Sequence, residues 1–256
     1  MNSEKTEPPE FSFIVTFLNE QGNVKNSIES LVNALRGWTF RYEIVCVDNG
    51  STDQTYREII EEQKVLPQIR IVTVPLNFGY GAGLLLGFVS ARGRNVGYIW
   101  GDHQIPEETI RICIQTFLKN PGTVVKGVRA SRGESLWRRF VSGVYNRIVR
   151  VLFGVRVMDT NSAPKIFPFN PLEKLNIRST DWFIDPEVII QLHRKKIPVI
   201  EIPFIPLKRL KGVSKVTWAT ILQFLANIIS YKVGGTPLRP IYSVSFTTRQ
   251  EQSNKT

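Results

Sequence analysis

A carboxylate and an amide stand two residues apart just after an apolar run. The run Val96–Trp100 is followed by Asp102 and Gln104, and Pro106 then opens a helical pattern. In open α/β sheets, ligands bind at the carboxyl ends of the strands. Carboxylate and amide oxygens suit Mg²⁺ or Mn²⁺, which often complete their coordination with substrate phosphates. The pair therefore predicts a divalent-metal site, although Asp-x-Gln alone is a weak signal.

A second polar turn begins where the apolar run Tyr42–Val47 ends. Asp48 closes the run, Gly50 permits a tight backbone, and Ser51 or Asp53 is suited to cap the following helix. By residue type alone, this turn is as consistent with a helix cap as with a ligand site.

Three glycines, Gly79, Gly81 and Gly83, invite comparison with dinucleotide-binding loops. They lack the G-x-G-x-x-G register and follow the third expected strand rather than the first, so we reject that interpretation. Close packing of a helix on the sheet beside a nucleotide is the better prediction.

Apolar runs alternate with helical patterns along the first half of the chain. The expected strands are 11–18, 42–47, 69–74, 96–100 and 123–128, and the expected helices are 24–35, 53–64, 81–91 and 105–118. This alternation predicts an α/β fold with a mostly parallel sheet covered by helices on both faces.

Composition limits the classes of protein and partner. The 256 residues are 42% hydrophobic and carry a formal net charge of +11, which predicts one large folded domain with an appendage. The charge indicates an anionic partner: a phosphorylated substrate, a membrane surface or nucleic acid. Simple solubility is the alternative explanation.

Two features predict a cytoplasmic location. Cys46 and Cys113 lie in apolar runs without metal-type or disulfide-type spacing, which indicates reduced core residues. The polar segment 1–10 has no apolar signal-peptide core and is expected to be flexible, as is the polar tail 234–256.

Taken together, the motifs resemble glycosyltransferase family 2, in its dolichol-phosphate mannose synthase-like branch. The matching pieces are Asn19-Glu20 and the segments 47–55, 77–81, 102–108 and 209–215. The resemblance implies a GT-A (Rossmann-like) catalytic domain over 11–215, a nucleotide-sugar donor, Mg²⁺ or Mn²⁺, and inversion at the anomeric carbon. It also implies a polyprenyl (dolichyl or undecaprenyl) phosphate acceptor. Nucleic-acid binding is not expected, because the basic residues follow phosphate-site motifs.

The resemblance assigns roles residue by residue. Asp102 and Gln104 would hold the metal against the diphosphate, offsetting charge on the leaving group. The positions carried over to donor binding are Thr16, Leu18, Glu20, Asp48, Asn49, Ser51, Asn77, Gly79 and Lys215. The positions carried over to the acceptor phosphate are Arg129, Arg139, Ser142 and Arg209. Arginine forks match phosphate oxygens well.

The acceptor decides whether a general base is needed. A phosphate is already an anionic nucleophile, whereas a hydroxyl on a glycan or small molecule would need a base, and Asp185 or Glu187 is then the candidate. The alternative for Asp159 and Glu187 is that they hold arginines in position.

The chain departs from the family pattern around the nucleotide. Trp100 replaces the first acid of the usual Asp-x-Asp, and Asn49 replaces the second acid of the pair after the second strand. Thr16 and Leu18 stand where Pro and Tyr are usual. The nucleotide base and the sugar of the donor therefore cannot be carried over from relatives. A non-catalytic protein that binds a nucleotide sugar is a further alternative.

Two later segments bear on the membrane. Apolar residues recur at helical spacing over 134–153 with four arginines between them, which indicates either a phosphate-binding or a solvated basic face, and Gly154 fits a C-cap. The segment 216–233 is mostly apolar with a polar stripe, and is too short and too striped for a transmembrane span. It predicts an amphipathic helix in an anionic membrane interface, making the protein peripheral on the cytosolic face. The alternatives are packing on the chain's own core or on an identical subunit in a homo-oligomer.

Overall fold

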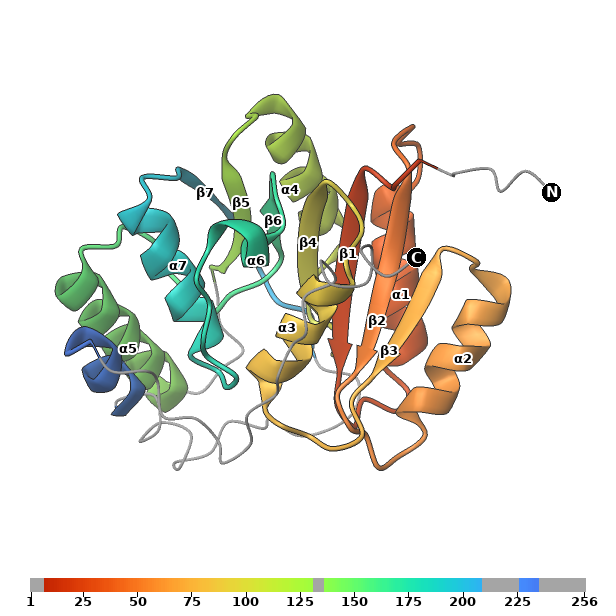
Figure 1. Cartoon of the computed structure of the whole chain (residues 1–256), viewed down its shortest axis with the longest axis horizontal. Helices are drawn as coiled ribbons and strands as arrows, with labels where there is room; N and C mark the ends of the chain where they lie inside the picture. The colour runs from red at the N-terminus through yellow and green to blue at the C-terminus, as the bar shows by residue number, and fades with distance from the viewer. Residues whose placement is uncertain (1–6, 131–135, 209–225, 235–256) are drawn as a thin grey trace, which may run out of the picture.

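The computed structural model describes residues 7–130, 136–208 and 226–234. Within these ranges seven strands form one sheet, in the order β3-β2-β1-β4-β6-β5-β7 (Figure 1). Their bounds are β1 Phe11–Phe17, β2 Tyr42–Asp48, β3 Ile69–Thr73, β4 Asn95–Trp100, β5 Val124–Arg129, β6 Lys165–Phe167 and β7 Val199–Phe204. Only β6 among them pairs antiparallel with its neighbours, so the prediction of a mostly parallel sheet is confirmed.

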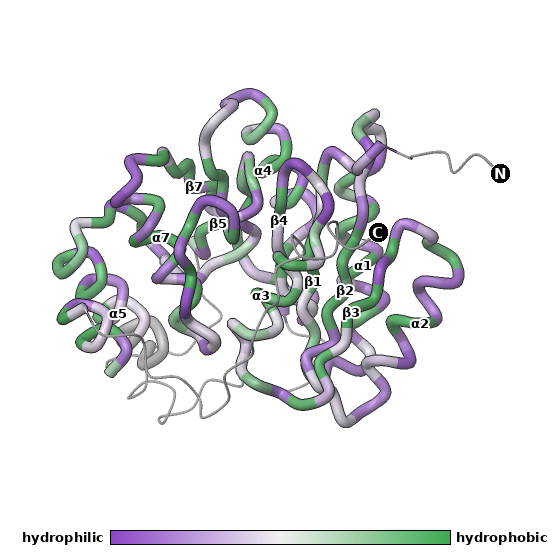
Figure 2. Tube along the Cα trace, in the orientation of Figure 1, coloured by the Kyte–Doolittle hydropathy of each residue, from purple (hydrophilic) through white to green (hydrophobic). Residues whose placement is uncertain are grey.

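Helices cover both faces of the sheet. Their bounds are α1 Val24–Leu35, α2 Thr55–Val65, α3 Tyr80–Ser90, α4 Glu107–Lys119, α5 Leu136–Phe153, α6 Pro171–Lys174 and α7 Ile184–Arg194. In Figure 1, α3 and α6 lie in front of the sheet and α1 and α4 lie behind it. The central strands are buried on both faces and consist of nearly continuous apolar runs, visible as green tube along β2 in Figure 2.

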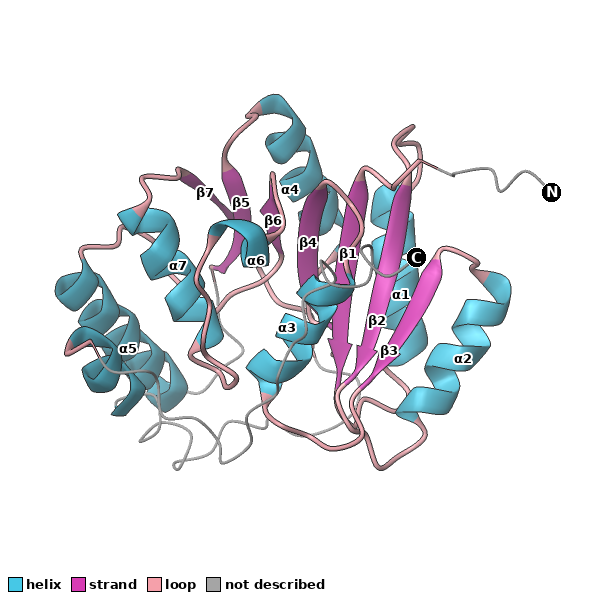
Figure 3. Ribbon diagram, in the orientation of Figure 1, coloured by secondary structure: helices cyan, strands magenta, loops and turns pink. Residues whose placement is uncertain are grey.

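The carboxyl ends of six strands meet at one edge of the sheet. In the parallel pairings of β1, Phe17 lies opposite Asp48 of β2, and Thr16 lies opposite Trp100 of β4. Because β6 is antiparallel to both β4 and β5, those two strands run the same way. Figure 3 shows the arrowheads of β1, β2 and β3 together at this edge. The strand order reverses between β1 and β4, the position at which such sheets bind ligands.

The predicted core is confirmed, and the glycine cluster packs closely both at the end of β2 and against residues 180–181. Cys46 and Cys113 are buried free thiols, and burial raises the pKa of Cys113 to about 12. A Cβ on Gly81 would lie 2.6 Å from the carbonyl oxygen of Asp181, and one on Gly79 would lie 2.5 Å from that of Thr180. These two glycines therefore let the start of α3 pack against residues 180–181, whereas a Cβ on Gly83 would lie 2.7 Å from Cγ of Asn49, at the end of β2.

The described end of the C-terminal segment packs on the chain itself. Residues 226–232 are helical, with Asn227 and Ile228 buried. The ring of Tyr231 lies 5.5 Å from Phe183 and 5.8 Å from Phe153. This face agrees with the own-core alternative, while residues 216–225 lie outside the described residues, so the full interfacial helix stays a prediction. Within the described ranges, every helix is too short or too polar to cross a membrane.

Candidate active site

The loop after β1 is tied to the loop after β2 by side-chain hydrogen bonds. Asn19, which has a φ of 49°, accepts a 2.8 Å bond from the amide of Thr52 through Oδ1. The amide of Glu20 donates to Thr55 Oγ1 at 2.8 Å, and the amide of Asn19 donates to Ser51 Oγ at 3.0 Å. Two neighbouring strand ends are thereby held as one polar wall, which contains the predicted donor residues Glu20 and Ser51.

Asp48 and Asn49 belong to the same polar wall and lie at the end of β2. Asp48 is 5% exposed and its Oδ1 accepts a 3.1 Å bond from the amide of Ser51. Asn49 is 3% exposed and its Nδ2 donates to the carbonyl of Gly79 at 3.0 Å, while the amide of Gly79 donates to Asn77 Oδ1. An ionised aspartate could not donate to Gly79. The hydrogen bond to Gly79 therefore explains why position 49 is an asparagine, without any loss of function.

Asp102 and Gln104 follow β4 on a tightly bound turn. The amide of Gly101 donates to the carbonyl of Thr16 at 3.0 Å, and its carbonyl accepts a 2.9 Å bond from Ser27 Oγ. Asp102 is 8% exposed, and its Oδ1 accepts a 3.3 Å bond from the amide of Gln104. The side chain of Gln104 donates through Nε2 to the carbonyl of Leu207 at 3.4 Å, after β7. Asp102 thus lies at the sheet edge, next to the strand whose end carries the donor-side wall.

Trp100 and Arg129 join the ends of β4 and β5. Arg129 Nε donates to Asp159 Oδ2 at 2.9 Å, and its guanidinium carbon lies 5.7 Å from the centre of the Trp100 ring. Burial disfavours the ionised carboxyl of Asp159, but the Arg129 charge and hydrogen bond outweigh burial and lower its pKa. Asp159 therefore holds an arginine, as the structural alternative predicted.

The comparisons with known proteins agree with this geometry. The model of the family described as Glycosyl transferase family 2 matches residues 12–175, more than half of the chain. The chain belongs to glycosyl transferase family 2. The GT-A fold and the family expected from the motifs are both confirmed.

Individual members of the family are distant from this one. Dodecaprenyl-phosphate galacturonate synthase of Rhizobium johnstonii is 27% identical, over 66% of this chain and 50% of the relative. Undecaprenyl-phosphate 4-deoxy-4-formamido-L-arabinose transferase of Pectobacterium carotovorum is 28% identical, over 89% of this chain and 68% of the relative. The chain spans about half the length of the first curated relatives it matches.

A solved structure shares the fold. Glucosyl-3-phosphoglycerate synthase of Mycobacterium tuberculosis, crystallised with Mn²⁺, UDP-glucose and phosphoglyceric acid, superposes with a TM-score of 0.69 at 18% identity. The match covers 93% of this chain and 88% of that one.

In this family 2 protein, Asp185 and Glu187 are buried and hydrogen-bonded. Asp185 accepts hydrogen bonds from the Tyr98 hydroxyl and the Lys165 ammonium group. Glu187 accepts bonds from the amides of Arg178 and Ser179, at 3.0 and 2.8 Å. Among the described residues, Glu187 binds the backbone amides of Arg178 and Ser179 and no arginine side chain, contrary to the alternative. A base role for either carboxylate stays a prediction that their burial disfavours.

The structure describes only some of the predicted acceptor residues. Ser142 lies on α5, where its carbonyl accepts a 3.0 Å bond from Asn146 Nδ2. The Arg139 side chain and the whole of Arg209 and Lys215 lie outside the described residues. At the described part of the edge, Thr16 and Leu18 are half-buried at the end of β1.

Tyr80 and Trp182 lie beside Trp100 and were not among the predicted site residues. Trp100 Nε1 donates to the Tyr80 hydroxyl at 3.2 Å, and the Tyr80 ring stacks on Trp182 with centroids 4.6 Å apart. Tyr80 lies within the matching segment 77–81, and that motif could have drawn attention to it.

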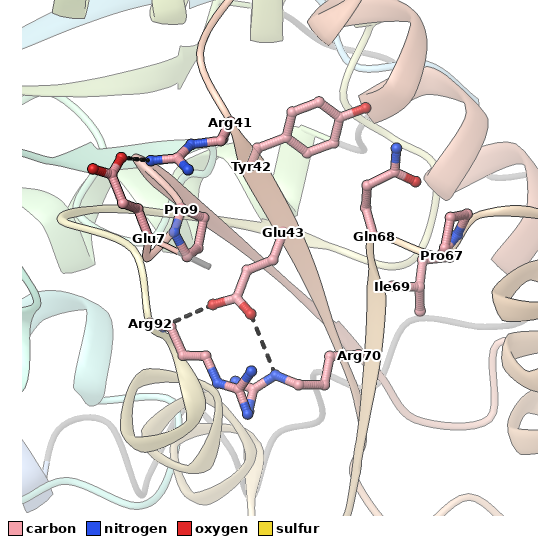
Figure 4. A pocket seen from close by; sticks show the side chains of 10 residues that line it. All are labelled: Glu7, Pro9, Arg41, Tyr42, Glu43, Pro67, Gln68, Ile69, Arg70 and Arg92. Carbon is pink, nitrogen blue, oxygen red and sulfur yellow. Dashed lines mark hydrogen bonds and ion pairs between the residues drawn. The ribbon is translucent and has the colours of Figure 1, made fainter. Parts of the chain in front are cut away.

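A hollow at the other edge of the sheet, where β2 and β3 begin, is lined by residues that form ion pairs. Figure 4 shows Glu43 between Arg70 and Arg92, and Arg41 paired with Glu7. Glu43 Oε2 lies 3.3 Å from Arg70 Nε, and Arg41 Nη2 lies 2.7 Å from Glu7 Oε2. These ion pairs fasten the starts of β2 and β3, so this hollow is a structural network rather than a candidate active site.

Proposed function

We propose that this protein transfers a sugar from a nucleotide-diphosphate donor to a polyprenyl phosphate, with inversion and with help from Mg²⁺ or Mn²⁺. The observation that carries the proposal is the placement of Arg129 at the end of β5, on the same sheet edge as Asp102. One group suits an acceptor phosphate and the other suits a metal-bound diphosphate. The printed names of curated relatives, which act with dodecaprenyl or undecaprenyl phosphate, support this acceptor class.

The donor side uses the polar wall and Asp102. Asp102 and Gln104 would supply oxygen ligands to the cation. Within the described ranges no three His, Cys, Asp or Glu residues cluster, so the diphosphate of the donor would complete the ligand set. A bound divalent cation would offset charge on the departing nucleoside diphosphate. The donor contacts proposed for Glu20, Asp48, Asn49, Ser51, Asn77, Gly79 and Lys215 follow the family resemblance. The related fold with Mn²⁺ and UDP-glucose, or with Mg²⁺ and UDP, supports the donor and metal classes.

The acceptor side binds an anion that needs no base. A phosphate oxygen attacks the anomeric carbon, the bond from that carbon to the diphosphate breaks, and no proton has to be removed from the nucleophile. Asp185 and Glu187 are buried and already bonded, which fits such an acceptor. We assign the phosphate to Arg129, with Arg139, Ser142 and Arg209 completing the site.

The lipid acceptor places the protein on an anionic membrane surface, as a peripheral protein on the cytosolic side. The outer face of α5 carries exposed Arg147 and Arg150 beside Val151, which is 74% exposed. Arginines attract acidic headgroups, and apolar side chains enter the interface. The interfacial helix proposed for 216–233 would extend this face.

The test is sugar transfer from a panel of radiolabelled nucleotide sugars to decaprenyl phosphate, with Mn²⁺ or Mg²⁺ and then with EDTA. Asp102→Asn keeps the size of the side chain and removes its charge, so we expect a loss of about 100-fold or more in kcat. Glu29→Gln, an exposed carboxylate change on α1, is the matched control and should transfer normally. Donor binding without transfer in the wild type would support the non-catalytic alternative instead.

A further inference from the structure

Trp100 occupies the position of a usual metal-site acid, but its contacts lie elsewhere. Its indole N–H donates to Tyr80 at the start of α3, at 3.2 Å, and its ring face lies beneath the Arg129 guanidinium at 5.7 Å. Tyr80 follows Gly79, whose carbonyl is bound by Asn49 of the donor-side wall. One side chain therefore contacts both the donor-side helix and the acceptor-side arginine.

The hydroxyl of Tyr80 orients the indole. Burial, aided by the nearby Asp185 charge, raises the pKa of Tyr80 well above its ordinary range, so the hydroxyl stays protonated while its oxygen accepts from Trp100. Asp185 is itself bonded to Tyr98 and Lys165. The orientation of Trp100 thus depends on Tyr80 at the start of α3.

Arg129 is held from two directions. Asp159 fixes its Nε in the guanidinium plane, and the Trp100 ring lies against the face of that plane. The arginine side chain is 29% exposed, so the held group still reaches the surface of the site. A guanidinium fixed in both plane and position loses less side-chain entropy when it binds a phosphate.

We propose that Trp100 is a positioning residue for the acceptor: its ring holds the Arg129 guanidinium ready for the phosphate, together with Asp159. This inference rests on the proposed function, because it takes Arg129 as the phosphate ligand.

The test compares Trp100→Phe, Trp100→Leu and Trp100→Asp. Calorimetric binding of farnesyl phosphate and the KM and kcat for decaprenyl phosphate are both measured. Phe keeps a ring beneath Arg129, whereas Leu removes it, so we expect Leu to weaken farnesyl phosphate binding about three- to tenfold more than Phe. Asp, which also lacks the ring, should weaken it at least as much as Leu, and the KM for the donor should change little in any variant. Trp38→Phe, at the opposite edge of the sheet, is the matched control.

Two results separate this inference from a general structural effect. In an Arg129→Lys background, which keeps the charge and loses the planar stack, the difference between Leu and Phe should vanish. Equal farnesyl phosphate affinity of all three variants, or a difference that persists in the Arg129→Lys background, would overturn the role of Trp100. Wild-type binding of farnesyl phosphate without sugar transfer would refute the proposed function alone, and absence of wild-type binding would refute both.

Discussion

At the residue scale, Asp185, the candidate base for a hydroxyl acceptor, is held in a buried polar network. Helix α7 supplies this carboxylate, β6 supplies Lys165 and β4 supplies Tyr98, and all three side chains are buried. The Lys165 ammonium group also lies 5.1 Å from the centre of the Tyr98 ring. Burial lowers the pKa of Lys165 to about 8 despite the neighbouring Asp185. The pair joins the one antiparallel strand of the described sheet to the helix in front of it.

Removing one partner of this pair should cost far more than removing a surface charge. Lys165→Met leaves Asp185 buried without its cation, so we expect the free energy of unfolding to fall by about 3–5 kcal/mol. The double variant Lys165→Met with Asp185→Asn should cost less than the sum of its parts. Lys64→Met, which breaks an exposed pair with Glu61, should change stability by less than about 0.5 kcal/mol. Urea unfolding measures the wild type, these three variants and Asp185→Asn alone, and additive single changes would contradict a coupled pair.

The same lysine predicts a pH dependence. Between pH 8 and the ordinary lysine value of 10.5, the unfolded chain holds a proton that folded Lys165 has released. The contribution of Lys165 to the free energy of unfolding therefore rises with pH across that interval. The stability difference between the wild type and Lys165→Met should widen from pH 8 upward. A constant difference would show that the pKa of Lys165 is not lowered.

At the scale of elements, the sequence predicted what local patterns encode. The strands β1 to β5 and the helices α1 to α4 fall within a few residues of the apolar runs and periodicities that predicted them. Gly154, with a φ of 70°, ends α5 as a C-cap. The strand β6 was missed because its three residues include the charged Lys165. The burial of Lys165 is compensated by its ion pair with Asp185 on α7, which the local sequence does not show. Asp48 and Asp102 could be placed at the sheet edge from strand ends alone, whereas the contacts of Trp100 with Tyr80 and Arg129 depend on tertiary structure.

The helical residues 226–232 give an element-scale test with two adjacent positions. Ile228 is 1% exposed in the core, and Ile229 is 64% exposed. We expect Ile228→Ala to lower the free energy of unfolding by about 2–4 kcal/mol and Ile229→Ala to change it by less than about 0.5 kcal/mol. Thermal or urea unfolding in the absence of lipid is the measurement. Equal effects would contradict the packing of this segment on the chain's own core.

At the scale of the whole molecule, the two edges of the sheet carry different kinds of residues. Ion pairs such as Glu43–Arg70 fasten the edge where the strands begin, and polar loops with Asp102 and Arg129 line the edge where most of them end. The net charge of +11 acts over the whole surface and favours the approach of phosphorylated substrates and acidic membranes. In our account, family 2 donor chemistry on this edge is directed to an anionic lipid acceptor.

The most direct test of that account compares two acceptors that differ by one group. Sugar transfer from the active donor is measured with decaprenyl phosphate and with decaprenol, in the same detergent and with the same divalent cation. We predict transfer to the phosphate and none above background to the alcohol, because we assign Arg129 to an anionic acceptor and Asp185 is buried and already bonded to Lys165. Transfer to the alcohol at a comparable rate, abolished by Asp185→Asn or Glu187→Gln, would contradict the central claim and establish a hydroxyl acceptor.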